Sequence, residues 1–338
     1  MTRRTAAPPR SLSPSRAADF QQCPLLYRFR VIDKLPERPN EAATRGTVVH
    51  AVLERLFDAP AGERSVPRAR ALVAPEWRRL LAKRPELAQL FGVRPAAEPG
   101  EVGDGDGEGE KAGDAVGDGA GSGAPAAGAA GPPLDEERLA AFLAEAERLV
   151  ERWFALEDPT RLEPAERELF VETTLPAGLR LRGVIDRVDV APGGEIRIVD
   201  YKTGKAPPEA YAGGALFQMK FYALVLWRLR GVVPRRLQLV YLGSGEVLSH
   251  DPEEAELLAV ERKVLALWDA ISRATDSGDW RPRRGRLCSW CDHQSRCPEF
   301  GGTPPPYPLP VPLPLPEQAG GGRESADAER PAAGGAAG

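Results

Sequence analysis

Two neighbouring segments near the middle of the chain alternate hydrophobic and polar residues. Residues 179–190 and 195–201 carry Val or Ile at alternate positions, and Pro192, Gly193 and Gly194 separate the two segments. Such alternation is typical of a strand with one buried face, and a short Pro/Gly segment between two such strands predicts a hairpin. The remaining pattern predicts strands at 167–175 and 236–243 and helices near 41–57, 66–91, 134–157, 208–230 and 252–275. We therefore expect an α/β fold in which a small mixed sheet is flanked by helices on both sides.

Glycine and proline are concentrated in two segments that differ from the rest of the chain. Residues 95–133 contain almost no large apolar side chain, and residues 302–338 combine a proline run with glycine and alanine. Such segments bury too little apolar surface to offset the entropy lost on ordering, so we expect both to be disordered. The prediction is a flexible terminus at 1–10 and a single domain formed by 11–94 and 134–301.

Composition and charge limit the classes of protein to which the chain can belong. Hydrophobic residues make up 42% of the chain, which supports a core, and no stretch approaches the roughly 18 apolar residues of a membrane span. The segment 95–133 holds eight carboxylates and one lysine, so the rest of the chain carries +3 although the whole chain carries −4. A mildly basic domain is compatible with a polyanionic ligand. The basic N-terminal residues include no apolar stretch that would direct secretion, so we expect the cytoplasm, where cysteines rarely form disulfides.

The four cysteines of the chain are unevenly spaced. Three form the motif Cys288-x2-Cys291-x5-Cys297, and Cys23 lies far upstream. Thiolates at this spacing favour one soft metal centre. His293 within the motif permits a Cys3His zinc site, whereas a [4Fe–4S] cluster would use all four cysteines. Such a cluster would connect the N-terminal helix to the C-terminal end of the domain.

The predicted hairpin places two carboxylates face to face. If the turn is centred on Gly193, Val188 pairs with Ile198 and Asp186 with Asp200, with Cβ atoms ~5 Å apart. Like charges in this position are destabilising unless a cation binds between them, and carboxylates suit Mg²⁺ or Mn²⁺. Lys202 would stand on the same face, where it could orient a water molecule or neutralise charge on a phosphate. Arg187 and Asp189 belong to the opposite face, which we expect to be solvated.

Together these features resemble the PD-(D/E)XK nuclease superfamily. The closest resemblance is to its RecB-like exonuclease family, in the iron–sulfur branch that includes the AddB nuclease domain and the CRISPR-associated RecB-like exonucleases. The segments that carry the resemblance, in chain order, are LSPSRAADFQQCPLLYRFR, RGTVVHAVLE, LRGVIDRVD, IVDYKTG, FQMKFYALVL and LCSWCDHQSRCPEF. The chain has no G-x-x-x-x-G-K-[ST] phosphate-binding loop, so a helicase would have to be supplied in trans.

The resemblance implies a restriction-endonuclease-like core with a role for each matching residue. Asp186, Asp200 and the Tyr201 carbonyl would bind a catalytic Mg²⁺ or Mn²⁺, with His50 as a further ligand. Lys202 would position the attacking water and stabilise the transition state. Taken by itself, His50 could instead be a hydrogen-bonded histidine of the core.

Further residues would complete the site. An accessory acid on the strand before the first catalytic aspartate is expected at Glu168 or Glu172, with Glu168 favoured. Gln218 and Tyr222, one helical turn apart, would border the site and contact the nucleic acid backbone, or serve only as satisfied polar groups of the core. Arg284, in a basic run beside the cysteines, would contact phosphates, or belong to a solvated loop.

These expectations combine into a metal-dependent deoxyribonuclease, an exonuclease on single-stranded ends that acts in DNA repair or recombination. The resemblance implies that Cys23, Cys288, Cys291 and Cys297 hold a structural [4Fe–4S] cluster, with Zn²⁺ as the alternative. One competing hypothesis is a catalytically silent iron–sulfur subunit that binds DNA or serves as a scaffold in a helicase–nuclease or CRISPR adaptation complex. Another is a zinc-ribbon interaction protein.

Overall fold

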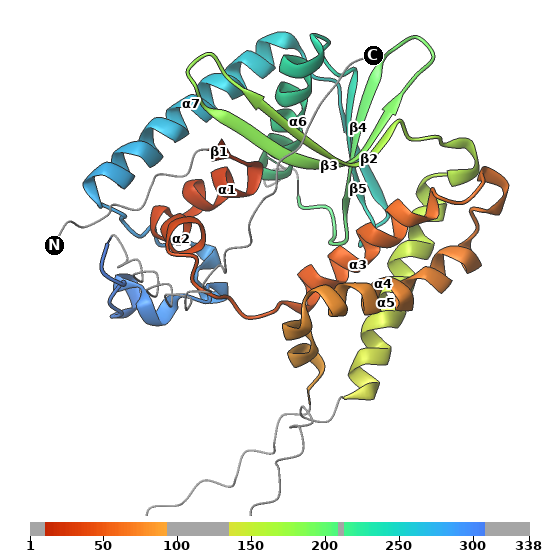
Figure 1. Ribbon diagram of the computed structural model, residues 1–338, viewed down its shortest axis with the longest axis horizontal. Coiled ribbons are helices and arrows are strands. Elements are labelled where there is room, and N and C mark those ends of the chain that lie inside the picture. The colour runs from red at the N-terminus through yellow and green to blue at the C-terminus, as the bar shows by residue number, and fades with distance from the viewer. Residues whose placement is uncertain (1–10, 93–134, 209–212, 308–338) are drawn as a thin grey trace, which may run out of the picture.

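The computed structural model describes residues 11–92, 135–208 and 213–307 (Figure 1). The predicted flexible terminus, the predicted insert and the tail beyond residue 307 lie outside the described residues. None of the described helices combines the length and the apolar character needed to cross a membrane.

A mixed sheet forms the centre of the molecule. Its six strands within the described residues are β1 (Ser11–Leu12), β2 (Glu166–Thr174), β3 (Arg180–Val190), β4 (Ile196–Lys202), β5 (Arg236–Tyr241) and β6 (Glu246–His250). The strand order is β1-β3-β4-β5-β6, and β2 also pairs with β3. The β1–β3 and β4–β5 pairs are parallel and the other pairs antiparallel, which confirms the predicted mixed sheet. Strands β1 and β6 were not predicted, because β1 has two residues and β6 is an edge strand without a buried face.

The hairpin of β3 and β4 has the register that the sequence predicts. Val188 pairs with Ile198 and Val190 with Ile196 across the antiparallel ladder. The turn contains Gly194 at φ 92°, a conformation that residues with a side chain rarely adopt. The ladder ends at Arg187 and Val199, one pair before the two aspartates.

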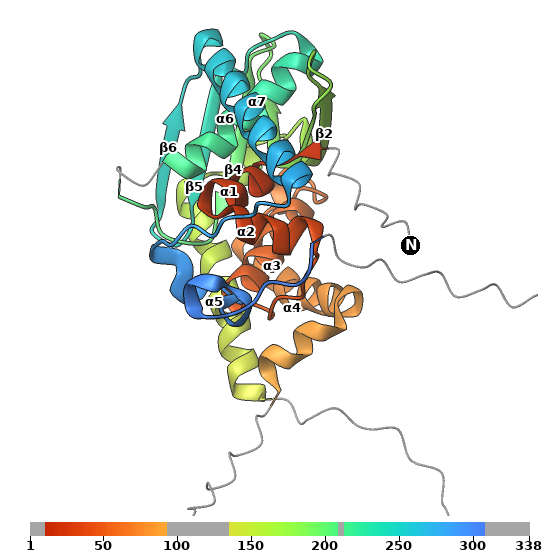
Figure 2. The same ribbon diagram turned by 90° about the vertical axis from the view of Figure 1, so that its left-hand side faces the viewer.

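Helices cover both faces of the sheet, which confirms the α/β prediction (Figures 1 and 2). They are α1 (Pro14–Gln22), α2 (Pro24–Tyr27), α3 (Glu41–Leu56), α4 (Val66–Lys83), α5 (Glu136–Leu156), α6 (Gly213–Arg230) and α7 (Glu254–Ser277). Buried residues of α1, α2, α6 and α7 form one hydrophobic core with the sheet. Those of α3, α4 and α5 form a second core with Val199, Tyr201, Val240 and Leu242 of β4 and β5 and the segment after it. The central strands β4 and β5 are therefore buried on both faces.

Two predictions about local structure were wrong. The single helix expected at 66–91 is divided into α4 and a 3₁₀ segment, Pro85–Phe91, because Pro85 disfavours the helical conformation at Arg84. Arg187 and Asp189, expected on a solvated face, are covered: Arg187 is only 1% exposed. The solvated interpretation assumed a sheet with one buried face, whereas α5 and the chain after it cover the second face.

The chain leaves and re-enters the domain at adjacent points on either side of the predicted insert. The Asp135 amide donates a hydrogen bond to the Phe91 carbonyl at 2.6 Å, and the Asp135 side chain caps α5 through the Arg138 amide. At the C-terminal end, the described residues up to Tyr307 contact the folded domain. The Tyr307 hydroxyl bonds the Thr275 carbonyl at 2.9 Å.

Deletion of residues 97–131 should leave the folded domain intact. Since Phe91 and Asp135 are already in contact, the shortened connection spans no additional distance, and a shorter loop costs less closure entropy. We expect the melting temperature and the nuclease rate to stay close to those of the full chain. Thermal unfolding and cleavage assays on both proteins would check this, and a large loss of either would assign the segment a structural or catalytic role.

Candidate active site

Asp186, in the middle of β3, is connected through β4 to His50, in the middle of α3. The Tyr201 amide donates to Asp186 Oδ2 at 2.7 Å, and the same oxygen lies 3.4 Å from His50 Nδ1. His50 Nε2 contacts the Tyr201 carbonyl at 2.9 Å. The helix can approach β4 closely because Gly46, one turn before His50, faces Thr203: a Cβ at that glycine would lie 3.3 Å from the threonine hydroxyl.

A candidate metal site lies at this junction. The ligand atoms of His50, Glu168 and Asp186 all lie within 4.8 Å of one another, a spacing that one cation can bridge. The structure thus brings together a histidine and two acids from α3, β2 and β3. Of the two acids considered on β2, Glu172 lies elsewhere and pairs with Arg180 at 3.4 Å.

Glu168 reaches this site through an irregular backbone. Its φ is 44°, in the left-handed region that residues with a side chain rarely adopt. The β2–β3 ladder is continuous on both sides, with Arg167 opposite Arg187 and Leu169 opposite Ile185, but it omits Glu168 and Asp186. Backbone strain of this kind is concentrated at functional sites, and no sequence pattern predicts it.

Crowding of acids changes the proton affinities of the site. Burial, reinforced by the negative charge of Asp186, raises the pKa of Glu168 to about 7. Burial alone would lower the pKa of His50, but its hydrogen bond to Asp186 and the charges of the surrounding acids raise it to about 9. Burial and the charge of Asp186 also raise the pKa of Asp200, despite its lysine neighbour. Protons on these groups therefore offset part of the negative charge of the site. A bound divalent cation would neutralise the same charge.

Asp200 faces α6 and a lysine. Lys202 Nζ lies 2.6 Å from Asp200 Oδ2 and 3.0 Å from Gln218 Oε1. The Gln218 amide donates to Asp200 Oδ1 and to the Tyr222 hydroxyl, both at 3.1 Å. The Gln218 side chain therefore connects the aspartate, the lysine and the tyrosine in one network.

Gly183 and Tyr241 lie beside this network, and the sequence did not identify either as a residue of the site. The Tyr222 ring packs directly on Gly183 of β3, where an added Cβ would lie 2.6 Å from the ring. A glycine within a strand is a signal of such a close approach. The Tyr241 hydroxyl is buried without a hydrogen-bond partner among the described residues, and Tyr241 pairs with Lys202 in the parallel register of β4 and β5. Nothing in its apolar surroundings in the sequence distinguishes it.

Two cavities adjoin these residues. One, of about 460 Å³, is lined by His50, Lys202 and Tyr241 among others, and the second, of about 370 Å³, by Gln218 and Tyr222. Arg284 lines neither. Its guanidinium lies over the Phe300 ring, beside the cysteines.

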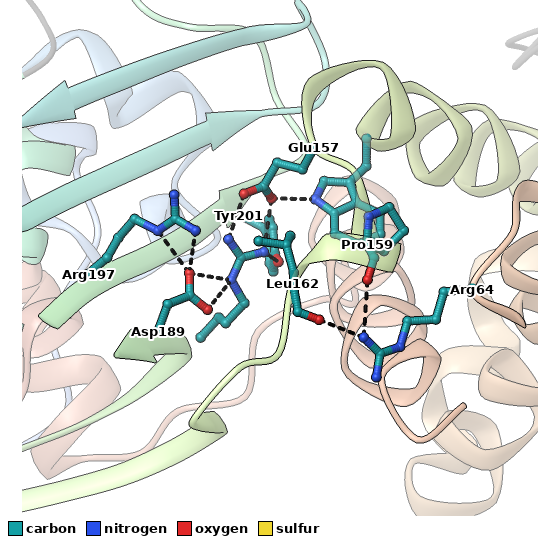
Figure 3. Close-up of polar contacts among 9 residues, drawn as sticks. Arg64, Glu157, Pro159, Leu162, Asp189, Arg197 and Tyr201 are labelled. Atoms are coloured by element: carbon teal, nitrogen blue, oxygen red, sulfur yellow. Dashed lines mark hydrogen bonds and ion pairs between the residues drawn. The ribbon is translucent and has the colours of Figure 1, made fainter. Parts of the chain in front are cut away.

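A buried polar network supports Tyr201 from the opposite face of the sheet (Figure 3). The Arg187 guanidinium donates to the Tyr201 hydroxyl at 2.5 Å and to both carboxylate oxygens of Glu157 at 2.6 and 2.9 Å. It also lies 3.1 Å from Asp189, which Arg197 contacts from the other side. Although burial opposes it, Arg187 lowers the pKa of Glu157.

The four cysteines line one cavity of about 160 Å³. Cys23, between α1 and α2, thereby lies beside the C-terminal motif, as the prediction requires. Backbone amides of Arg283 and Gly285 point to the sulfurs of Cys23 and Cys288 at 3.4 and 3.3 Å. Burial raises the pKa of the Cys291 thiol.

The spacing of the sulfurs bears on which metal centre they suit. Among the described residues, no three cysteines bring their sulfurs within 4.8 Å of one another. His293, the alternative zinc ligand, directs Nε2 to Glu37 at 3.0 Å, and its buried Nδ1 has no partner in the described part of the chain. Ligands of one tetrahedral zinc ion would lie closer together, given a Zn–S distance of about 2.3 Å.

The chain is similar to known proteins in sequence and in structure. Gene 69 protein of Mycobacterium phage L5 is 28% identical over 126 residues, which cover 36% of this chain and 41% of the phage protein. The match thus spans less than half of that relative. The crystal structure of a candidate exonuclease from Eubacterium rectale superposes with a TM-score of 0.49 and 13% identity, over 84% of this chain and 88% of that one. The model of the PD-(D/E)XK nuclease superfamily matches residues 11–298, and the chain belongs to this superfamily.

Proposed function

We propose that the protein is a metal-dependent deoxyribonuclease that degrades DNA from single-stranded ends, in repair or recombination. The observation that carries the proposal is the convergence of His50, Glu168 and Asp186 next to the Asp200–Lys202 pair. Five groups that can bind a cation or stabilise a phosphorane lie at the junction of β2, β3, β4 and α3, in a chain of a nuclease superfamily. The preference for ends and for single strands derives from the RecB-like resemblance alone.

Each side chain has a role that its contacts support. His50, Glu168 and Asp186, with Asp200 beside them, would hold Mg²⁺ or Mn²⁺, which would supply charge stabilisation for the phosphoryl oxygens. The Lys202 ammonium would donate to the attacking water or to a phosphate oxygen. Gln218 holds Lys202 in place by accepting one of its protons in a hydrogen bond.

The experiment that tests the function uses three end-labelled or internally labelled substrates: linear single strands, linear duplexes and circular single strands. With Mn²⁺ or Mg²⁺ we expect cleavage of the linear single strand, and none with EDTA. Cleavage of the circle would refute the end requirement while retaining the nuclease. A folded protein that binds DNA but cleaves none of the substrates would favour the catalytically silent scaffold.

We also propose a structural [4Fe–4S] cluster on the four cysteines. The cavity shared by all four cysteines and the amides directed at two of the sulfurs support a cluster, which would use all four thiolates. An anaerobic preparation should be brown, absorb near ~400 nm and contain iron and sulfide. Stoichiometric zinc in a colourless preparation would refute the cluster.

Substitution of Cys23 should remove the cluster and loosen the N-terminal helices. Cys23→Ser deletes the one ligand from outside the C-terminal motif, so we expect loss of the ~400 nm absorption and a lower melting temperature. Ser289→Ala, within the motif but not a ligand, is the matched control. Unchanged absorption of Cys23→Ser would exclude Cys23 as a ligand.

A further inference from the structure

Strand β3 has an unpaired stretch on one edge. β2 occupies one edge along Arg180–Val188, so β1 and β4 must share the other. On that edge β1 pairs with positions 180 and 181 and β4 with 187–190. Among the described residues, positions 182–186, about 16 Å of strand, have no strand partner on that edge. The gap ends at Asp186, which belongs to the candidate metal site.

A groove of about 370 Å³ lies at this gap. Its walls are the start of α1, the middle of β2 and β3, and the start of α6, and its lining includes Ser13, Phe170, Arg182, Val184, Phe217 and Gln218. Gln218 and Tyr222 line the groove and also belong to the network around Asp200. The groove is therefore continuous with the candidate active site.

One wall of the groove presents an exposed aromatic ring. Phe170 is 59% exposed, and Val184, its partner across the β2–β3 ladder, is 40% exposed. Exposed apolar side chains that lie side by side form a patch, and such patches mark binding surfaces. The face of an aromatic ring stacks on any unpaired nucleobase, and such stacking contributes about 1–3 kcal/mol per base. A base that is paired within a duplex is not available for this contact.

The same sheet wall carries Arg182, which has no carboxylate partner among the described residues. Glu172 lies opposite Arg182 in the ladder but pairs with Arg180 instead. Arg182 has no ion pair with any described residue, and its charge lies near that of Arg16, whose guanidinium bonds Ser11. Two neighbouring guanidinium groups that repel each other are stabilised by a phosphate.

We propose that this groove binds the single strand that leads to the metal site, with a base stacked on Phe170 and a phosphate held by Arg182. The proposal rests on the proposed nuclease function and adds the basis of its selection for single strands. Stacking on Phe170 requires an unpaired base, and the phosphate contact orients the strand along the open edge of β3 toward Asp186.

The test compares full-length variants in binding and in cleavage. Binding of labelled oligo-dT is measured with Ca²⁺ in place of the catalytic ion, and kcat and KM with Mn²⁺. Phe170→Ala should weaken binding about tenfold, with the loss in KM rather than kcat, and Phe170→Trp should restore binding. Arg182→Gln should weaken binding and reduce the dependence of log Kd on log salt by about 0.7. Val247→Ala, an exposed strand residue on β6 with the same exposed fraction as Val184, is the control.

The outcomes separate the two proposals. Wild-type affinity in Phe170→Ala, or an equal loss in Val247→Ala, would overturn the groove and leave the nuclease function standing. A wild type that cleaves duplex DNA but does not bind oligo-dT would also overturn the groove and leave the nuclease function standing. A wild type that cleaves nothing, combined with selective loss of binding in Phe170→Ala, would retain the groove and refute the nuclease.

Discussion

Lys202→Ala is expected to reduce phosphodiester cleavage by about 10²–10³-fold, the effect typical of removing one donor that stabilises developing charge. The Lys202 ammonium lies between Asp200 and Gln218, at the edge of the cavity that His50 also lines. No other cation contacts Asp200 among the described residues, so the lost donor has no substitute. Single-turnover cleavage of labelled DNA with saturating Mn²⁺ would measure the chemical step directly.

Lys205→Ala is the matched control. Lys205 lies three residues further along the same segment and is exposed, so its removal deletes the same charge without touching the Asp200 network. We expect at most a small change in its cleavage rate. Far-UV circular dichroism of both variants would confirm folding, and Mn²⁺ binding would show whether Lys202→Ala retains the metal. Equal rates in wild type and Lys202→Ala would place the catalytic centre elsewhere.

The loss should persist when the charge is kept but its geometry changed. Lys202→Arg retains the positive charge, but a planar guanidinium cannot occupy the ammonium position between two acceptors without displacing one. We expect its rate to remain well below that of the wild type. A wild-type rate in Lys202→Arg would show that charge alone is sufficient.

The local sequence was enough to predict the hairpin and its register, because alternation and the glycine turn act over a few residues. Val188 does pair with Ile198 as the pattern requires. The predicted pairing of Asp186 with Asp200 lies just past the end of the ladder, where the Tyr201 amide donates a hydrogen bond to Asp186 instead. Alternation carries no information about where a ladder ends.

The rest of the site depends on contacts between distant segments. The left-handed conformation of Glu168 and the open edge of β3 result from how β1, β2 and β4 share one strand. Likewise, the burial of Arg187 depends on α5, which no pattern within β3 reveals.

Arg187→Met is expected to lower the free energy of unfolding by about 3–5 kcal/mol, the usual effect of removing one partner from a buried ion pair. Methionine replaces most of the apolar volume but leaves the carboxylates of Glu157 and Asp189 without the guanidinium that contacts both. Denaturant unfolding at neutral pH would measure the change. The Tyr201 hydroxyl also loses a donor, so we expect weaker Mn²⁺ binding through the Tyr201 backbone.

Arg197→Met is the control that separates the effect of burial on stability from the effect of charge. Arg197 contacts the same Asp189 oxygen at 2.8 Å, but its side chain is 33% exposed, and partly exposed ion pairs contribute about 1 kcal/mol or less. Similar losses in the two variants would show that the network stabilises through its charge rather than through buried contacts.

The pH dependence provides an independent check of the same pair. In the wild type Arg187 holds the pKa of Glu157 below its ordinary value, so the pair stabilises the fold above that value, and the contribution is lost as the pH falls. Without the guanidinium, burial is opposed only by the smaller effects of the Trp153 hydrogen bond and the Arg197 charge, so we expect the folded-state pKa of Glu157 to rise above its ordinary value. The folded variant then binds a proton more tightly than the unfolded chain does. The difference in free energy of unfolding between the wild type and Arg187→Met should therefore decrease as the pH is lowered. A deficit that stays constant from neutral to acidic pH would mean that lost packing, and not the stranded Glu157 carboxylate, accounts for the destabilisation.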